Sequence, residues 1–360
     1  MDEERRALAR SAGLVGVVFL GTLVVLLGLA LAFRGRDGGG GESSPTLGAG
    51  TEPPATVSMP APPAGGPSAS VDASSGQSGE PDASAAGPTG APSGDPVLVG
   101  AGDIATCSLD DDSATAALID GIGGAVFTAG DNAYGNGSAD DFGGCYEPTW
   151  GRFKDRTRPS AGNHDWATQN AQGYRDYFGA QALNADGDTW YSYDLGGWHV
   201  VVLDGNCSKV DGCGPDSPQG RWLAADLAAS NAVCTMAIWH QPRFSSGEEH
   251  GNDPTVDPFW RALYAAGADV IVNGHDHDYE RFAPQDPDGD EDRGRGIREF
   301  VVGTGGMSLR GFNDPQPNSE LRLAVSHGVI EFTLRARHYD WRFIPTEPNS
   351  PTDTGSAPCH

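Results

Sequence analysis

Short apolar runs that end in a potential metal ligand recur through this chain, and they constrain its fold more than any other feature. Five such runs are followed, in chain order, by Asp103, Asp131, Asn163-His164, His240 and His275-Asp276-His277. In α/β folds, polar ligands gather at the carboxyl ends of buried strands. Structural loops have no need for such a coincidence. The pattern therefore predicts an α/β chain whose strand ends share one polar site.

The last run places two histidines two residues apart. His275 and His277 follow the apolar residues 270–272. On an extended strand end, residues i and i+2 point the same way. Gly274 has no side chain to block a close approach. The two imidazoles are therefore expected to converge on one locus.

Strand and helix patterns alternate from residue 96 onward. Helices are expected near 113–120 and at 219–229 and 258–266. Strands are expected at 96–102, 124–129, 191–195, 200–203, 234–239, 270–272 and 299–303, with a closing hairpin at 329–334 and 339–344. Strands that alternate with helices, together with paired extra strands, imply an α/β domain with mixed sheets.

The first 95 residues have a different composition from the rest. Residues 1–13 are polar and are predicted to be a cytoplasmic N-terminus, and 14–33 form an apolar stretch about as long as the ~20 residues that span a bilayer. We interpret 14–33 as a transmembrane anchor. A cleaved signal peptide is the alternative, because Ala30-Leu31-Ala32 resembles a cleavage site.

Residues 34–95 are mostly Gly, Pro, Ser, Ala and Thr. Such a segment buries too little apolar surface to offset its ordering entropy, so a disordered linker is expected. A globular catalytic domain is expected at 96–345, followed by a loose Pro/Ser/Thr-rich tail at 346–360. The catalytic domain would then be extracytoplasmic on the cell membrane, or secreted if the N-terminal segment is cleaved.

The chain is acidic, with 49 Asp and Glu against 23 Lys and Arg and a formal net charge of −26. Such a surface disfavours nucleic acid, whose affinity comes mainly from basic contacts to phosphates. It does not exclude a small phosphorylated substrate, because bound cations can invert the local charge.

Six cysteines after an export segment suggest disulfides. Cys207 and Cys213 share one polar loop and are the first expected pair. Six cysteines allow fifteen pairings, and spacing does not choose among them. The cysteines outside this loop could form one further pair, Cys107 with Cys145, and leave over Cys234 and Cys359.

The candidate metal ligands combine two carboxylates, a phenol, an amide and three imidazoles: Asp103, Asp131, Tyr134, Asn163, His240, His275 and His277. This mixture of hard oxygen and borderline nitrogen suits iron, manganese or zinc rather than calcium. Seven ligands are too many for one tetrahedral ion and suit two ions that share a bridging carboxylate. Two ions roughly 3.5–4 Å apart favour in-line displacement at phosphorus.

These ligand blocks resemble the signature of calcineurin-like metallophosphoesterases. Tyr134 is similar to the tyrosine ligand of the purple acid phosphatase branch, and residues 275–281 resemble the last block of its plant-type members. Glu249-His250-Gly251, downstream of His240-Gln241-Pro242, resembles the small mammalian-type enzymes. The blocks are Gly102-Asp103, Gly130-Asp131, Gly162-Asn163-His164-Asp165, His240 and Gly274-His275-Asp276-His277.

The resemblance implies a four-layer sandwich in which two mixed β-sheets are flanked by helices. It also implies that His164 and His250 face the substrate phosphate and the leaving group. It assigns a first ion, iron(III), to Asp103, Asp131, Tyr134 and His277. It assigns a second ion, divalent iron, zinc or manganese, to Asn163, His240, His275 and the bridging Asp131.

The expected function is that of an exported dinuclear-metal phosphatase, similar to acid phosphatases, that hydrolyses phosphomonoesters by attack of a metal-bound hydroxide. The catalytic residues would be His164, His250 and the bridging Asp131. The expected partner is a small phosphorylated substrate, without nucleic acid and with membrane contact only through the N-terminal segment. A phosphodiesterase or nucleotidase on the same scaffold is the alternative, and a non-catalytic surface binding protein is a third reading.

Overall fold

The structure is a computed structural model that describes residues 94–360. The expected N-terminus at 1–13, the expected anchor at 14–33 and nearly all of the expected linker at 34–95 lie outside the described residues. Among the helices of residues 94–360, none combines the length and apolar character that crossing a bilayer requires.

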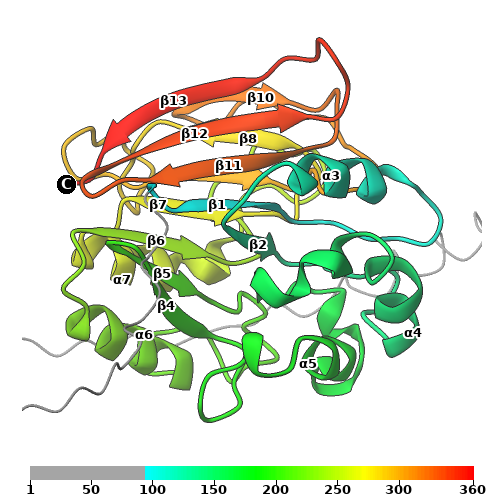
Figure 1. The fold of residues 1–360 in the computed structure, drawn as a ribbon. Coiled ribbons are helices and arrows are strands. Elements are labelled where there is room, and N and C mark those ends of the chain that lie inside the picture. Colours follow the sequence, from blue (N-terminus) through cyan, green and yellow to red (C-terminus); the bar gives the residue numbers. More distant parts are fainter. Residues whose placement is uncertain (1–93) are drawn as a thin grey trace, which may run out of the picture. The chain divides into compact units, whose positions relative to one another are not determined.

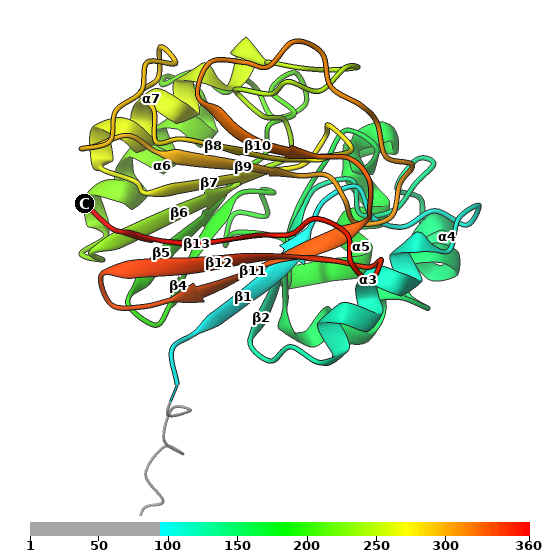
Figure 2. The same cartoon turned by 90° about the horizontal axis from the view of Figure 1, so that it is seen from above.

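Within residues 94–360 the strands form two mixed sheets that face each other (Figures 1 and 2). The six-stranded sheet, in spatial order, consists of β13 (Asp353–Pro358), β12 (His338–Pro345), β11 (Gly328–Leu334), β1 (Val97–Ala101), β2 (Ala125–Ala129) and β3 (Thr157–Ser160). The seven-stranded sheet consists of β10 (Ser319–Leu323), β8 (Tyr279–Phe282), β9 (Arg298–Val302), β7 (Val270–Asn273), β6 (Cys234–Ile238), β5 (Trp198–Val202) and β4 (Tyr191–Leu195).

Helices cover the outer side of each sheet (Figure 2). On the side of the six-stranded sheet lie α3 (Asp111–Asp120), α4 (Ala139–Asp141) and α5 (Gln172–Phe178). On the side of the seven-stranded sheet lie α6 (Pro218–Ala229) and α7 (Asp257–Ala266). Single 3₁₀ or π segments lie at Phe142–Tyr146, Trp150–Arg156, Asp165–Ala167, Gln169–Ala171, Gly179–Gln181 and Pro254–Val256. The expected sandwich of two mixed sheets flanked by helices is confirmed.

An aromatic core joins the two sheets. Phe300 of β9 packs edge-on against Phe332 of β11, with ring centroids 5.3 Å apart. Tyr279 of β8 lies against Phe343 of β12, with centroids 4.3 Å apart. All four rings are at most 1 % exposed. Because alternate residues of a strand face the same side, these inward rings hold the two sheets in one relative position.

Parallel strands of both sheets end at the same edge of the sandwich. In the six-stranded sheet, β1, β2 and β3 pair in parallel. In the other sheet, β5, β6, β7 and β9 pair in parallel. The candidate ligands follow the carboxyl ends of β1, β2, β3, β6 and β7. The topology therefore brings residues that are far apart in the chain to one place.

The C-terminal segment is not a loose tail, so the prediction for residues 346–360 was wrong. Asp353–Pro358 forms strand β13, which pairs antiparallel with β12. The carboxylate of Asp353 is buried and accepts hydrogen bonds from side chains of β8 and β12. A disulfide joins Cys359 to Cys234. The free edge of β12 and this covalent link override the low strand propensity of the segment.

All six cysteines lie in the described part of the chain and are paired. The two pairs considered from the sequence are present, and the two cysteines that spacing left over bond to each other. The disulfides are Cys107–Cys145, Cys207–Cys213 and Cys234–Cys359.

The Cys234–Cys359 disulfide is expected to stabilise the domain more than the Cys207–Cys213 disulfide. Its cysteines are 125 residues apart, against 6 for the other pair. By loop-closure entropy, the double Cys→Ser variant of the first pair should lose about 5 kcal/mol of unfolding free energy, and that of the second about 2 kcal/mol. Urea unfolding without reductant, followed by tryptophan fluorescence, measures both losses. Equal losses would contradict this ranking.

Candidate metal centre

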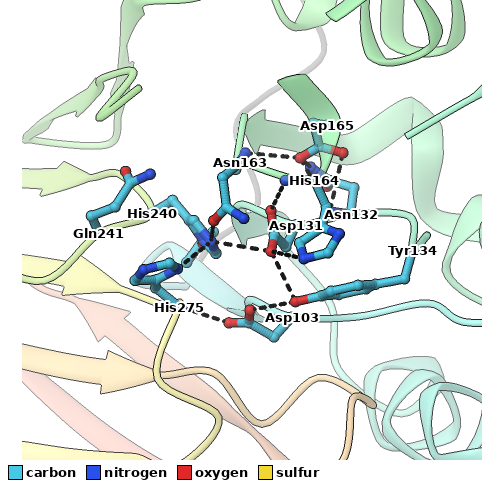
Figure 3. A network of polar contacts seen from close by, with 12 residues as sticks. Asp103, Asp131, Asn132, Tyr134, Asn163, His164, Asp165, His240, Gln241 and His275 are labelled. Atoms are coloured by element: carbon cyan, nitrogen blue, oxygen red, sulfur yellow. Dashed lines mark hydrogen bonds and ion pairs between the residues drawn. The ribbon is translucent and has the colours of Figure 1, made fainter. Parts of the chain in front are cut away.

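Three candidate ligands sit in strained turns directly after their strands. The φ angles of Asp103, Asp131 and His275 are 58°, 49° and 73°. A left-handed backbone at a residue other than glycine costs on the order of 1–3 kcal/mol and is concentrated at functional sites. In Figure 3 the three side chains leave their strand ends and point toward one cluster. The fold thus accepts backbone strain in order to aim these groups inward.

Two motif glycines let the ligand blocks approach one another. Gly130 has φ +83°, and a Cβ at that position would lie 2.5 Å from Nδ1 of His240. A Cβ on Gly274 would lie 2.6 Å from Oδ2 of Asp103. Real Cβ atoms do not tolerate such distances. The Gly-Asp and Gly-His pairs therefore reflect close packing between blocks of different sheets.

One half of the cluster is centred on the hydroxyl of Tyr134. The phenolic oxygen lies 2.8 Å from Oδ1 of Asp103 and 2.9 Å from Oδ2 of Asp131. Nε2 of His277 lies 3.3 Å from the phenolic oxygen and 3.3 Å from Oδ1 of Asp103. These four residues are those expected at the first ion.

The other half is centred on Nε2 of His240 (Figure 3). This atom lies 3.1 Å from Oδ1 of Asn163, 3.2 Å from Nδ1 of His275 and 3.3 Å from Oδ2 of Asp131. Oδ2 of Asp131 therefore takes part in both halves. The contacts group the seven side chains in the way that the expected division between two ions requires.

Backbone carbonyls orient two of the imidazoles. Nδ1 of His240 lies 2.8 Å from the oxygen of Ala129, and Nδ1 of His277 lies 3.0 Å from the oxygen of Ser308. Because a carbonyl oxygen only accepts hydrogen bonds, each Nδ1 carries a proton, and each Nε2 faces the cluster, where it could bind a metal ion after losing its own proton. Metal-binding histidines are typically held in this way.

The electrostatics of the cluster fit a cation. Asp103 and Asp131 are at most 1 % exposed. Burial opposes the charge on Asp131, but His240 and His164 together outweigh burial and hold the pKa of this carboxyl well below its usual range. Burial also opposes the charge on His240, but Asp131 and Asp103 raise its pKa to about 10. Two buried carboxylates thus draw positive charge into the cluster.

The pKa values of Tyr134 and His275 also fit bound cations. Burial, with Asp103 and Asp131 next, raises the pKa of the Tyr134 phenol well above its usual value, so an ionised phenolate there needs a strongly positive partner. Burial, with His240 and His250 next, lowers the pKa of His275 to about 3, which keeps this imidazole neutral as a ligand must be. The donor set fits two metal ions.

His164 and His250 lie on two sides of this cluster. The backbone N–H of His164 donates to Oδ1 of Asp131 at 2.8 Å, and its ring lies 4.3 Å from that of Tyr134. The ring of His250 stacks on His275, with centroids 3.9 Å apart and planes 20° apart. The side chain of His164 is partly exposed and His250 is exposed, so both histidines reach solvent.

Two carboxylates that support the site were not assigned a role from the sequence. The carboxylate of Asp276 accepts hydrogen bonds from Oγ of Ser245 at 2.5 Å and from the backbone N–H groups of Gly251 at 3.1 Å and His250 at 3.3 Å. It therefore holds the loop that carries His250. The sequence did offer one signal for Asp276, because it lies between His275 and His277 and its side chain faces the opposite way.

The second is Asp165, the last residue of the Asn163-His164-Asp165 block. Its carboxylate accepts hydrogen bonds from the N–H of Gly162 at 2.8 Å and from Nδ2 of Asn132 at 2.9 Å. Burial, with Asp131 next, raises its pKa to about 7. Asp165 thus ties the Asn163 turn to the Asp131 turn.

Comparisons with known proteins identify the family to which this chain belongs. The sequence model of the calcineurin-like phosphoesterases matches residues 100–279, which contain every candidate ligand and both candidate catalytic histidines. The chain belongs to the calcineurin-like phosphoesterase family. The resemblance inferred from the five ligand blocks is thereby confirmed.

Within this family the chain is similar to purple acid phosphatases. It is 27 % identical to purple acid phosphatase 22 of Arabidopsis thaliana over 229 residues, covering 54 % of this chain and 50 % of that protein. The solved purple acid phosphatase of yellow lupin seeds has a TM-score of 0.59 at 17 % identity and covers 74 % of this chain and 54 % of that one. The chain thus spans about half the length of the plant relatives it matches.

A second solved structure shares the fold. It is GAP50, described as the anchor in the inner membrane complex of Plasmodium. It has a TM-score of 0.53 at 16 % identity and covers 74 % of this chain and 89 % of that one. Since one fold can serve unrelated functions, the function of this chain has to be argued from its site.

If the two halves of the cluster hold separate ions, His275→Ala and His277→Ala should each remove one metal preferentially. Metal content of the purified full chain, measured by inductively coupled plasma mass spectrometry, should fall from about two ions to about one in either variant. A different element should be lost in each, because the two donor sets differ in hardness. His338→Ala, an exposed histidine of β12, is the control and should keep both ions. Loss of both metals in each variant would contradict the division.

Proposed function

We propose that this protein is a dinuclear-metal phosphatase that hydrolyses phosphomonoesters. The observation that carries the proposal is the shared position of Asp131, whose Oδ2 lies 2.9 Å from the Tyr134 oxygen and 3.3 Å from Nε2 of His240. A carboxylate oxygen common to two donor clusters is what a bridging ligand requires. The family match and the similarity to purple acid phosphatases support the same reading.

Two ions at these clusters would attract the phosphate oxygens. They would also lower the pKa of a water molecule, so that hydroxide is available to attack phosphorus near neutral pH. The residues of the chain hold this positive charge in position. The two carboxylates and the phenol fix the positions of positive charge. The backbone N–H of His164 also steadies Asp131 at 2.8 Å. This pre-organised charge favours the transition state of phosphoryl transfer.

His164 is the first candidate to contact the phosphate and the leaving group. Its Nδ1 lies 2.7 Å from the carbonyl oxygen of Gly135, which fixes the ring and leaves Nε2 free for substrate. Nε2 lies 3.9 Å from Oδ2 of Asp131. His250, stacked on His275, is the second candidate on the opposite side of the cluster. Either imidazole can give a proton to the departing alkoxide: His164 from Nε2, and His250 from Nδ1, since Nε2 of His250 faces the guanidinium of Arg310.

The three disulfides favour an oxidising compartment. We therefore also propose that the domain acts outside the cytoplasm, anchored to the cell membrane or secreted.

His164→Ala should lower kcat for p-nitrophenyl phosphate by about 10²–10⁴-fold, because it removes a positioned group at the leaving oxygen. The metal content of the variant should stay unchanged, since the side chain of His164 is not one of the seven donors. His338→Ala is the matched control and should keep full activity. Normal turnover by His164→Ala would exclude this role for His164.

The same assay should include bis-p-nitrophenyl phosphate as a diester. The proposal expects higher kcat/KM for the monoester, and a preference for the diester would favour the phosphodiesterase alternative. Hydrolysis of neither ester by the fully metal-loaded protein would contradict a phosphatase and favour a binding role.

The iron assignment predicts colour. A phenolate of Tyr134 bound to iron(III) would give a visible charge-transfer absorption band in the purified protein. Tyr134→Phe should lose this band, whereas Tyr193→Phe, a tyrosine of β4 outside the cluster, should keep it. A colourless, active protein that is unaffected by Tyr134→Phe would exclude iron(III) at this position and leave the hydrolase in place.

A further inference from the structure

The loop between β9 and β10 lies against the candidate metal centre, although no ligand block of the sequence falls in it. The carbonyl oxygen of Ser308 accepts the Nδ1–H of His277 at 3.0 Å. The backbone N–H of Arg310 donates to the carbonyl oxygen of His277, also at 3.0 Å. Two hydrogen bonds therefore fix this part of the loop to a candidate ligand and place Arg310 at the edge of the cluster.

The guanidinium of Arg310 reaches His250, the second candidate catalytic histidine. Its Nη1 lies 2.9 Å from Nε2 of His250. A guanidinium only donates hydrogen bonds, so His250 Nε2 accepts. His250 in turn stacks on His275, with ring centroids 3.9 Å apart. A permanent positive charge thus lies one side chain away from the candidate ligands of the second ion.

The anionic partner of Arg310 is held weakly. Its Nε lies 3.0 Å from Oε2 of Glu249, whose side chain is 55 % exposed, while that of Arg310 is 26 % exposed. Ion pairs that water reaches contribute little to stability, because the solvent screens the two charges. A phosphate group can therefore replace Glu249 without a large loss. The forked N–H groups of a guanidinium match phosphate oxygens well.

The charge of the phosphate group decides whether a phosphomonoester or a phosphodiester gains more binding energy from a contact with Arg310. A phosphomonoester carries about −1.5 to −2 charges at neutral pH, whereas a diester carries one. Two ions neutralise part of this charge, and Arg310 offers a further positive group for an unesterified oxygen. A diester replaces that oxygen with an uncharged ester oxygen and a second substituent.

We infer that Arg310 is a specificity-determining residue that contacts the phosphate and favours phosphomonoesters over diesters, with Glu249 as the counter-ion it releases when substrate binds. The inference rests on the proposed phosphatase function and specifies how that site selects its substrate. It differs from a purely structural role, in which Arg310 would only brace the loop through Glu249 and His250.

The test compares Arg310→Ala and Arg310→Lys in the metal-loaded full chain. Removing one charged hydrogen-bonding group should lower kcat/KM for p-nitrophenyl phosphate by about 10- to 100-fold. For bis-p-nitrophenyl phosphate the loss should be under about threefold. Arg310→Lys should recover part of the monoester activity, because it restores the charge without the fork. Equal losses for the two esters would overturn the inference.

Arg152→Ala is the matched control. Arg152 pairs with Asp120 on the surface at 2.8 Å, with a side chain that is 37 % exposed, and belongs to a different part of the fold. This variant should change neither ester's kcat/KM. Metal content and thermal unfolding of every variant show whether a loss comes from damage to the centre.

Binding of inorganic phosphate, followed by calorimetry, separates this inference from the proposed function. Arg310→Ala should weaken phosphate binding about 10- to 100-fold. Glu249→Gln should tighten it about two- to fivefold, because it removes the competing charge. Unchanged phosphate affinity in both variants would overturn the role of Arg310 even if the protein is a phosphatase. If neither ester is hydrolysed but phosphate binding responds as expected, the phosphatase proposal fails and the anion contact stands.

Discussion

The structure depends on keeping two carboxylates, Asp103 and Asp131, buried side by side. Two negative charges at most 1 % exposed repel each other and lose their hydration, so they need positive charge nearby. His240 and His277 supply part of it, at 3.3 Å from Asp131 and from Asp103. Metal ions would supply the rest. Because its carboxylates need nearby positive charge, the cluster favours cation binding. It can bind cations only when the fold brings the carboxylates and the imidazoles together.

The two sheets divide this chemistry between them. The carboxylates follow β1 and β2 of the six-stranded sheet, whereas the imidazoles follow β6 and β7 of the seven-stranded sheet. The cluster therefore forms only when the sheets pack in one relative position, which the rings of Phe300 and Phe332 help to hold. Because the donors come from both sheets, metal binding would stabilise the packing of the sandwich as well as the local turns.

Strands and helices with strong apolar patterns could be predicted from the sequence, within a few residues at their ends. The strands that were missed have weak patterns. In β8 (Tyr279–Phe282) a buried Glu280 interrupts the apolar residues. Its carboxylate can be buried because it accepts hydrogen bonds from the N–H and Oγ of Ser246, which lies in another loop. The edge strand β13 consists of residues that favour turns and is held by β12 and by the disulfide of Cys359. In each case a tertiary contact outweighs local propensity.

The sequence by itself determined which donor groups the chain possesses, their order and their attachment to strand ends, because motif spacing and side-chain chemistry are local properties. On that basis every candidate ligand could be named, and the structure brings all seven together. Only the tertiary structure decided which donors touch, that Asp276 supports the loop of His250, and that Arg310 reaches this histidine from a loop without any motif. Distances between side chains on different strands depend on how the two sheets pack, and no spacing along the chain records that packing.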